Sequence, residues 1–339
     1  MNDGTRHDIL LTGISGFIAK HCALRFLNAG HRVRGTLRNA ARREEVVSAL
    51  RPHLKRPELE ANLDFVSLDL TRDEGWDRAM AGMTALVHTA SPFPIAQPKD
   101  ADDLIRPAVD GTLRALRAAQ AAGVGRVILT SSVVAVSNDG VAGQRDETDW
   151  CDPDRPATTA YARSKTMAER VAWDFAATSG IRLTTINPGL VLGPPLDGHY
   201  GSSVGLVKRI LSGRDPMMPD IGFGIVDVRD VAEMHLRALE LPETAGKRFL
   251  AVAGHMRMPD MARDLKARFP ARRIPTMVAP NAIVRFLSVF DPSIRAILPQ
   301  LGRTTTYSSA RARTEMGMNF TSPTGALAAS ADWLVAHGV

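Results

Sequence analysis

The chain has 339 residues, 45% hydrophobic and 23% charged, which is enough apolar material for one large α/β domain or two smaller ones. Basic residues outnumber acidic ones by 42 to 36 but form no stripe, so no nucleic-acid partner is expected. Two cysteines, Cys22 and Cys151, exclude a disulfide scaffold and a cysteine-only zinc site. No apolar run reaches the roughly 18 residues that span a bilayer, and the polar start leads straight into a strand without a signal peptide. We therefore expect a cytoplasmic protein that is not bound to membranes.

Short β-type runs alternate with longer helical patterns through the first half of the chain. The predicted strands are apolar on both faces and lie at 9–12, 32–37, 63–68, 85–89, 126–130 and 182–186. The helical patterns lie between them, near 17–29, 73–81, 102–122 and 160–179. This alternation predicts an α/β fold in which helices cover both faces of a doubly wound parallel sheet.

The second half is less regular and is rich in glycine and proline from residue 187 to 195. It contains predicted helices near 202–212 and 229–241, predicted strands near 224–228 and 248–253, and a closing helix that begins at Ser322-Pro323. The segment 270–306 is expected to form helix and loop over a cleft. We predict a nucleotide-binding domain at 1–190, to which the strands and helix near 224–253 return. A smaller substrate-binding lobe is expected from 191–223 and 254–339.

A glycine-rich turn follows the first predicted strand and opens the first helix, in the sequence Thr12-Gly13-Ile14-Ser15-Gly16-Phe17-Ile18-Ala19. Gly13 permits a sharp turn, Gly16 lets the backbone approach a pyrophosphate, and Ala19 lets the helix lie close to the strand. The N–H groups at the start of the helix then face the phosphates. In this context the turn predicts a Rossmann-type dinucleotide fold, although a glycine turn alone is also common in other folds.

The end of the second predicted strand indicates which dinucleotide is bound. An NAD enzyme usually has an acidic residue there for the ribose 2′-hydroxyl, but this stretch has Arg38, and the next acid is Glu44. A guanidinium can bind a 2′-phosphate through two hydrogen bonds. NADP(H) is therefore favoured, while the alternative is a solvated arginine at a strand end.

Further candidates lie after the third and fourth strands. The carboxylate of Asp69, beside Leu70, is expected to hold the adenine, with a turn or helix cap as the alternative. Thr89-Ala90-Ser91 are small residues at the carboxyl edge of the sheet, where ligands bind in open α/β folds. His88 lies inside an apolar strand and is expected to be a hydrogen-bonded core histidine. No spacing of histidine and acidic residues predicts a metal site.

Tyr161 and Lys165 lie four residues apart, which places them on one face of a helix. An ammonium at about 4 Å would stabilise a phenolate by roughly 4 kcal/mol at an effective dielectric constant of about 20. The pKa of the tyrosine would then fall by about three units, towards neutral pH. The chain has only three tyrosines and seven lysines, so a chance pairing is less expected.

The fifth predicted strand ends in Ser131-Ser132, at the same edge of the sheet. A serine hydroxyl there can donate a hydrogen bond to a substrate carbonyl that Tyr161 protonates. Two serines after a strand are, by themselves, equally typical of a turn.

Taken together, the glycine turn, Leu129-Thr130-Ser131-Ser132, the Tyr161/Lys165 pair and Asn187-Pro188-Gly189 resemble the extended short-chain dehydrogenase/reductases. Within them the chain is similar to the group with dihydroflavonol reductase, cinnamoyl-CoA reductase and methylglyoxal reductases, over residues 8–255. The resemblance implies that Ser132, Tyr161 and Lys165 form the catalytic set. It also implies that Arg38 lies at the 2′-phosphate, that Pro188 and its neighbours lie beside the nicotinamide, and that the protein is a homodimer. The plant cinnamoyl-CoA motif around the tyrosine is absent, so neither a flavonoid nor a CoA thioester is predicted as substrate.

We therefore predict an NADPH-dependent reductase of an aldehyde or ketone, with Tyr161 as proton donor. An NAD-dependent nucleotide-sugar epimerase or dehydratase and a non-catalytic NADP-binding sensor remain as alternatives. The residues expected to bind the cofactor are Thr12, Gly13, Ser15, Gly16, Phe17, Ile18, Arg38, Asp69, Leu70, Thr89, Ala90, Ser91, Tyr161, Lys165, Pro188, Gly189 and Leu190. The residues expected to line an apolar substrate pocket, or else to pack between the lobes, are Phe93, Ile95, Tyr200, Ser202, Ser203, Met217, Met218 and Phe223.

Overall fold

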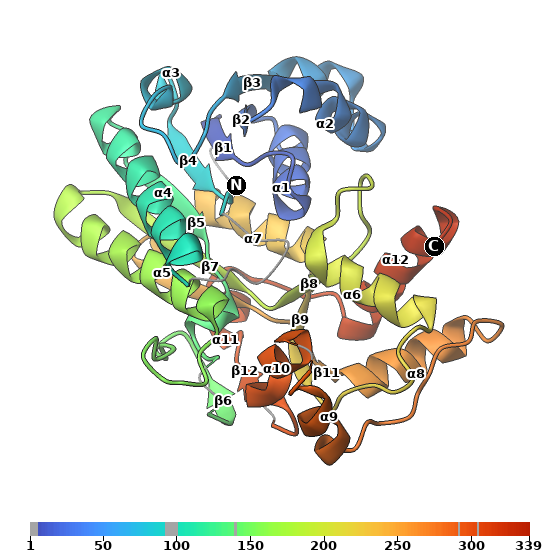
Figure 1. The fold of residues 1–339 in the computed structure, drawn as a ribbon. Coiled ribbons are helices and arrows are strands. Elements are labelled where there is room, and N and C mark those ends of the chain that lie inside the picture. Colours follow the sequence, from blue (N-terminus) through green and yellow to red (C-terminus); the bar gives the residue numbers. More distant parts are fainter. Residues whose placement is uncertain (1–5, 92–100, 139–140, 291, 304) are drawn as a thin grey trace.

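The computed structural model of the protein describes residues 6–91, 101–138, 141–290, 292–303 and 305–339 (Figure 1). Within these ranges, seven strands form one parallel sheet in the order β10-β7-β5-β4-β1-β2-β3. Their bounds are β1 (Asp8–Thr12), β2 (Arg32–Leu37), β3 (Leu63–Ser67), β4 (Ala85–His88), β5 (Arg126–Thr130), β7 (Arg182–Pro188) and β10 (Lys247–Ala251). The strand order reverses between β1 and β4, so a crevice is expected at their carboxyl ends. This confirms the predicted Rossmann-type sheet.

Helices cover both faces of this sheet because its strands are apolar on both sides (Figure 1). One face is covered by α1 (Phe17–Asn28) and α7 (Val228–Glu240), whose buried residues share one core with the sheet. A second core lies under α3 (Trp76–Met80), α4 (Asp102–Ala121) and α5 (Ala160–Ser179). The site is therefore carried by strand ends that are fixed from two sides.

Helix α5 has clear boundaries in the sequence. The hydroxyl of Thr159 accepts a hydrogen bond from the N–H of Ala162 at its start, and Gly180 ends it with a left-handed φ of 76°. The predicted bounds of this helix are confirmed without change. Residues spaced by four along it lie on one face, which is how Tyr161 and Lys165 are brought together.

The second lobe contains a three-stranded sheet in the order β11-β9-β8. Its strands are β8 (Leu190–Leu192), β9 (Gly222–Asp227) and β11 (Gly254–Arg257), and it is covered by α6 (Gly201–Ser212), α8 (Met258–Arg268) and α12 (Pro323–Ala336). The expectation that the strand near 224–228 returns to the main sheet is wrong. Only one residue separates β7 from β8, and β8 provides a new edge with which β9 pairs. Of the segment near 224–253, only α7 and β10 return to the main sheet. The division into two domains at the predicted boundaries stays a prediction.

The segment 270–306 holds α9 (Asn281–Leu287), α10 (Pro292–Ile297) and the short strand β12 (Thr305–Tyr307), which pairs with β6 (Gly143–Arg145). The helix α2 (Arg43–Leu50), in the first half of the chain, was not predicted from the sequence.

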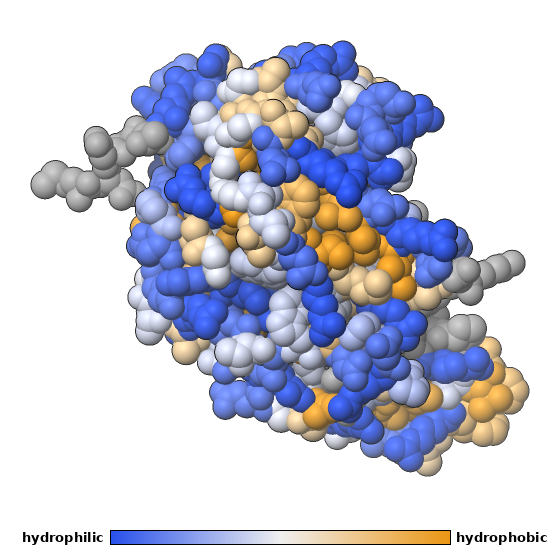
Figure 2. All heavy atoms as spheres, turned by 90° about the vertical axis from the view of Figure 1, so that its left-hand side faces the viewer, coloured by the Kyte–Doolittle hydropathy of each residue, from blue (hydrophilic) through white to orange (hydrophobic). Residues whose placement is uncertain are grey.

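Around α9 large apolar side chains are exposed, with Phe286 at 65% and Phe290 at 73%. Figure 2 shows hydrophobic side chains gathered in the middle of one face of the molecule, with hydrophilic surface above and below them. Among the described residues no helix is long and apolar enough to cross a membrane.

Candidate active site

The glycine turn between β1 and α1 is closed by short-range contacts that leave no room for larger residues. Gly13 has a φ of +69°, and a Cβ added there would lie 2.8 Å from the Cβ of Ala90. The N–H of Gly16 donates to the carbonyl of Gly13 at 2.9 Å, and the N–H of Gly13 donates to the hydroxyl of Thr36 at 3.0 Å. The turn is thus held between the ends of β2 and β4.

No side chain caps the N-terminus of α1, so no side chain accepts a hydrogen bond from its first N–H groups, which lie at the turn. Such a terminus favours an anion. Of the predicted cofactor residues here, Ser15 accepts a hydrogen bond from Arg42 at 3.1 Å, Phe17 is buried in the core and Ile18 is half-buried. Phe17 is therefore available to a ligand through its backbone rather than its ring.

Arg38 is exposed at the end of β2, where an open hollow of about 650 Å³ lies between β3 and α3. Asp69 lines the same hollow, while the half-buried Leu70 packs on the core under α4. The carboxylate of Asp69 accepts hydrogen bonds from the N–H and the hydroxyl of Thr71, at 2.9 and 2.8 Å. These two bonds lower the pKa of Asp69. The carboxylate therefore forms the turn that the sequence left open as an alternative.

The ends of β1 and β4 are joined by a small hydrogen-bond network. Thr12 Oγ1 lies 2.9 Å from Nδ1 of His88 and accepts from the N–H of Ala90 at 3.2 Å, while the hydroxyl of Thr89 donates to the carbonyl of Thr12 at 2.6 Å. Burial lowers the pKa of His88 to about 3, so this histidine is neutral. It is the hydrogen-bonded core histidine that the sequence predicts.

Three predicted catalytic side chains meet at the carboxyl edge of the sheet. Ser132, which follows β5, shares a side-chain hydrogen bond with Tyr161 on α5. Its hydroxyl also lies 3.4 Å from the carbonyl of Pro188. Lys165, one turn after Tyr161, lines a small cavity of about 10 Å³ together with Ser91 and other residues of β4, β5 and α4.

The expected lowering of the Tyr161 pKa by Lys165 is wrong for this structure. Burial raises the pKa of Tyr161 to about 12, and the group that lowers it is the hydrogen bond with Ser132. Burial also lowers the pKa of Lys165 to about 8, against the charge of Glu169, which raises it. The four-residue spacing indicates only the mutual attraction of the pair, whereas in the fold the removal of both groups from water has the larger effect on the two pKa values.

Pro188, Gly189 and Leu190 lie where the chain passes from the main sheet into the small one. The N–H of Gly189 donates to the carbonyl of Ala251 at 3.1 Å, and a Cβ at this position would lie 2.2 Å from the carbonyl oxygen of Gly224. Only glycine fits this approach of two strands. The crossing places Pro188 beside Ser132.

The predicted substrate residues are spread over the second lobe. Phe93 and Ile95 lie outside the described residues. Tyr200 packs edge-on against Trp333, Met218 is fully buried, and neither of the two hollows is lined by the predicted residues of this lobe. Those that are exposed or half-buried are Tyr200, Ser202, Ser203, Met217 and Phe223. Their role in binding a substrate stays a prediction.

Comparison with known proteins shows the family to which a chain with this site geometry belongs. Residues 9–253 match the model of the NAD dependent epimerase/dehydratase family. The chain belongs to this family. It is 34% identical over 274 residues to cinnamoyl-CoA reductase 1 of Petunia hybrida, covering 79% of each chain. It is 34% identical over 310 residues to the ketoreductase azaE of Aspergillus niger, covering 84% of this chain and 90% of the other. The structure of a yeast methylglyoxal/isovaleraldehyde reductase complexed with NADPH matches with a TM-score of 0.80 and 25% identity, over 97% and 98% of the two chains.

The resemblance to extended short-chain dehydrogenase/reductases is thus confirmed. The structure also shows, around the predicted site, contacts of side chains that the sequence could not assign. Thr36 supports the glycine turn, and Arg42 contacts it through Ser15. Glu169 and Asn187 are hydrogen-bonded to each other behind the predicted catalytic set. The four-residue spacing of Tyr161, Lys165 and Glu169 along α5 was the available signal for Glu169.

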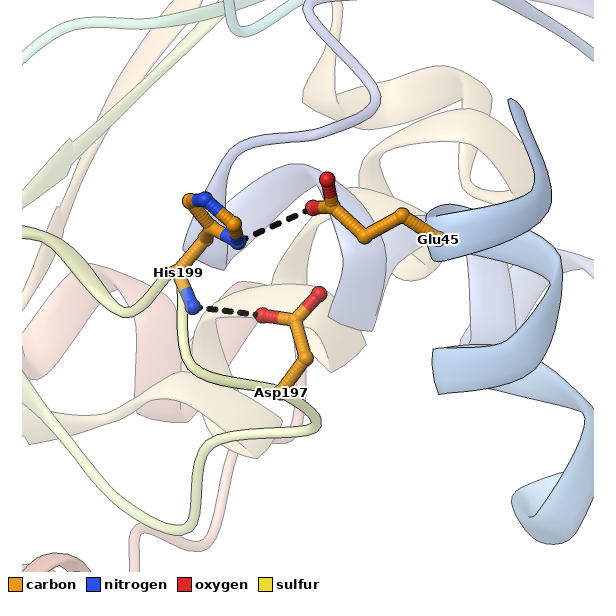
Figure 3. A group of neighbouring side chains, drawn as sticks. All are labelled: Glu45, Asp197 and His199. Atoms are coloured by element: carbon orange, nitrogen blue, oxygen red, sulfur yellow. Dashed lines mark hydrogen bonds and ion pairs between the residues drawn. The ribbon is translucent and has the colours of Figure 1, made fainter. Parts of the chain in front are cut away.

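Among the described residues, one group has the composition of a metal site: Glu45 of α2 with Asp197 and His199 of the loop before α6 (Figure 3). His199 Nδ1 lies 3.0 Å from the carboxylate of Glu45. Two cations already face these acids, because the buried Lys20 pairs with Asp197 and Arg42 pairs with Glu45 at 2.7 Å. The group therefore joins α1 and α2 to the second lobe through ion pairs.

Proposed function

We propose that this protein reduces an aldehyde or ketone to the alcohol with NADPH. The observation that carries the proposal is the hydrogen-bonded pair of Ser132 and Tyr161, with Lys165 one turn further along α5. These groups converge at the carboxyl edge of the sheet, which is the edge at which the glycine turn lies. Relatives at 34% identity whose names specify a reductase and a ketoreductase support this activity.

The residues fit a dinucleotide that carries a 2′-phosphate. The turn at Gly13 has no space for a Cβ, and the uncapped start of α1 offers N–H groups to a pyrophosphate. The guanidinium of Arg38 stands exposed at the hollow where an adenosine would lie, and β2 ends without an acid. Lys165 is proposed to hold the nicotinamide ribose, with Pro188, Gly189 and Leu190 beside the ring. The NADPH bound in the yeast neighbour supports this choice of cofactor.

The side chains have separate roles in the proposed reaction. NADPH, when bound, supplies a hydride to the carbonyl carbon. The Ser132 hydroxyl orients the carbonyl oxygen by a hydrogen bond, and Tyr161 Oη transfers its proton to that oxygen. With a pKa of about 12, Tyr161 holds this proton at neutral pH. The hydrogen bond with Ser132, which lowers the pKa of Tyr161, stabilises the phenolate that remains.

The test is a panel of aldehydes and ketones assayed with NADPH and with NADH. The expected result is oxidation of NADPH by at least one carbonyl, at a kcat/KM at least tenfold above that with NADH. Purified protein that retains tightly bound NAD would instead support the epimerase or dehydratase. Binding of NADPH without turnover on any carbonyl would support a sensor.

Three finer points belong to the same proposal. We place the reductase in the cytoplasm, and we expect a homodimer because the resemblance to extended short-chain dehydrogenase/reductases implies one. The second lobe, from 191–223 and 254–339, would supply the substrate pocket. Since the plant cinnamoyl-CoA motif is absent, a moderately bulky aliphatic or aromatic carbonyl without a CoA group is the proposed substrate class.

A further inference from the structure

Behind the catalytic set lies a carboxylate that the proposed mechanism does not use. Glu169 is on α5, one turn after Lys165 and two turns after Tyr161, and its side chain is fully buried. A buried ionised acid is costly unless every lone pair is used and a cation is near. The contacts of Glu169 show how this requirement is met.

The two carboxylate oxygens of Glu169 accept hydrogen bonds from strand ends on both sides of the site. Oε2 accepts from the hydroxyl of Ser131 at 2.6 Å and from the amide of Asn187 at 2.7 Å. Oε1 accepts from the hydroxyl of Thr185 at 3.0 Å and from Nε of Arg248 at 2.8 Å. The indole N–H of Trp173 donates to Oε1 at 3.3 Å.

These contacts bear on the position of Ser132. Ser131 is its neighbour in the chain, and the amide of Asn187 donates a second hydrogen bond to the carbonyl of Ser132, at 3.2 Å. The N–H of Ser131 donates to the carbonyl of Ile186 at 2.8 Å. The Ser131 side chain is therefore bound to the carboxylate of Glu169 directly, and the Ser132 carbonyl is linked to the same carboxylate through the amide of Asn187.

The carboxylate also acts on Lys165. Both groups line the cavity of about 10 Å³, which is close to the size that one water molecule needs. The other titratable group facing Lys165 across this cavity is the neutral His88 of β4. Burial drives the pKa of Lys165 down, and the charge of Glu169 opposes this change.

We propose that Glu169 is a positioning residue of the reductase, which fixes the backbone at Ser132 and serves as the counter-ion that keeps Lys165 charged. The proposal rests on the proposed function, because Ser132 and Lys165 have their roles only in that reaction. Arg248 has a different role, because its guanidinium neutralises the Glu169 carboxylate by binding Oε1. The same guanidinium stacks on the ring of Trp150 at 3.8 Å and donates to the carbonyl of Glu147.

The decisive variants separate charge from packing. Glu169→Gln keeps the shape and removes the charge, but it leaves Arg248 buried without its partner, which is destabilising. The double variant Glu169→Gln with Arg248→Met removes both charges, so the unfolding temperature is expected to return towards that of the wild type. Trp173→Phe is the matched control, since it removes one hydrogen bond to Glu169 and no charge.

The first measurement needs neither cofactor nor substrate. Lysines are labelled by reductive ¹³C-methylation, the signal of Lys165 is assigned with Lys165→Arg, and its titration is followed by NMR. Both variants without Glu169 are expected to titrate Lys165 at least one pH unit lower than the wild type, whereas Trp173→Phe titrates unchanged. An unchanged Lys165 titration in the variants without Glu169 would overturn the counter-ion role, whatever the enzyme reduces.

The second measurement is the pH profile of the reduction. Without Glu169, kcat/KM is expected to fall about 100-fold and its alkaline limb to move to lower pH, in the stable double variant as well. Recovery of full activity in the double variant would mean that Glu169 only supports folding, and the positioning role would be wrong. Absence of turnover in the wild type would count against the proposed function, while the NMR titration would still decide the counter-ion role.

Discussion

The two ends of the predicted cofactor groove are built in opposite ways. At one end Arg38 stands in water beside an open hollow, with its charge free to meet a ligand. At the other end the half-buried Tyr161 and Lys165 and the buried Glu169 follow one another along one face of α5, and their neighbours also hold the fold together. Replacing a charged residue at the open end is expected to change the stability little. Replacing one at the buried end leaves its hydrogen-bond and ion-pair partners unsatisfied and is expected to destabilise the fold.

The largest expected effect is at the buried end. Tyr161→Phe removes the proton donor while keeping the ring, so kcat is expected to fall about 10²- to 10⁴-fold. The control is Tyr307→Phe, because the hydroxyl of Tyr307 donates to the carbonyl of Ser137 at 3.1 Å, outside the catalytic set. Steady-state assays with NADPH check this, and Tyr161→Phe with near wild-type kcat would contradict the catalytic assignment.

The glycine turn joins the two ends, and the next effect is expected there. Gly13→Ala combines a left-handed backbone, which costs about 1–2 kcal/mol, with a clash against Ala90 of roughly 1–3 kcal/mol. Gly30→Ala is the control, since Gly30 has a φ of +93° and open space around it. Denaturant unfolding is expected to show the larger loss for Gly13→Ala, and only this variant should weaken NADPH binding. Equal losses would mean that the close approach to Ala90 is unimportant.

At the open end the effect should be confined to cofactor choice. Arg38→Ala is expected to reduce the preference for NADPH over NADH by about tenfold, the value of one lost charge-assisted hydrogen bond of roughly 1.4 kcal/mol. Stability should be unchanged. Arg56→Ala, another exposed arginine of the same lobe, is the control. A preference that survives Arg38→Ala would place the 2′-phosphate elsewhere.

The smallest effect is a pH dependence of stability that comes from the buried core behind the site. His235 is fully buried on α7, its Nε2 lies 2.7 Å from Oγ1 of Thr130, and burial lowers its pKa to about 4. The unfolded chain takes up a proton below about pH 6.5 and the native chain does not, so stability falls as the pH is lowered through this range. Between pH 7 and pH 6 the loss is ~0.7 kcal/mol, and His235→Gln should remove this contribution from the urea-unfolding curves. An unchanged pH dependence would show that this histidine is not neutral in the fold.

The same contrast explains how much the sequence predicted. Strands β2 and β5 and helix α5 have the predicted bounds, because apolar runs, Thr159 and Gly180 mark them locally. The three side chains predicted to be catalytic lie together in the fold for the same reason, since two of them are one helical turn apart. The pKa of Tyr161 was predicted in the wrong direction because burial depends on the whole fold, which the spacing does not contain.

Other misses have the same cause. The strand β9 was assigned to the main sheet because its apolar pattern does not say which edge it joins. The carboxylate of Glu169 draws its donors from three strands that are distant in sequence, so only the structure shows them together.

The passage of the chain at Gly189 limits how the molecule can be taken apart. One residue separates β7 of the large sheet from β8 of the small one, and the chain crosses again between β9 and α7 and between β10 and β11. A cut at any single crossing leaves at least one of the two sheets without a strand. The two lobes therefore cannot be expressed as separate modules or exchanged by a simple fusion. A new substrate lobe would have to be introduced by replacing loops within the continuous chain.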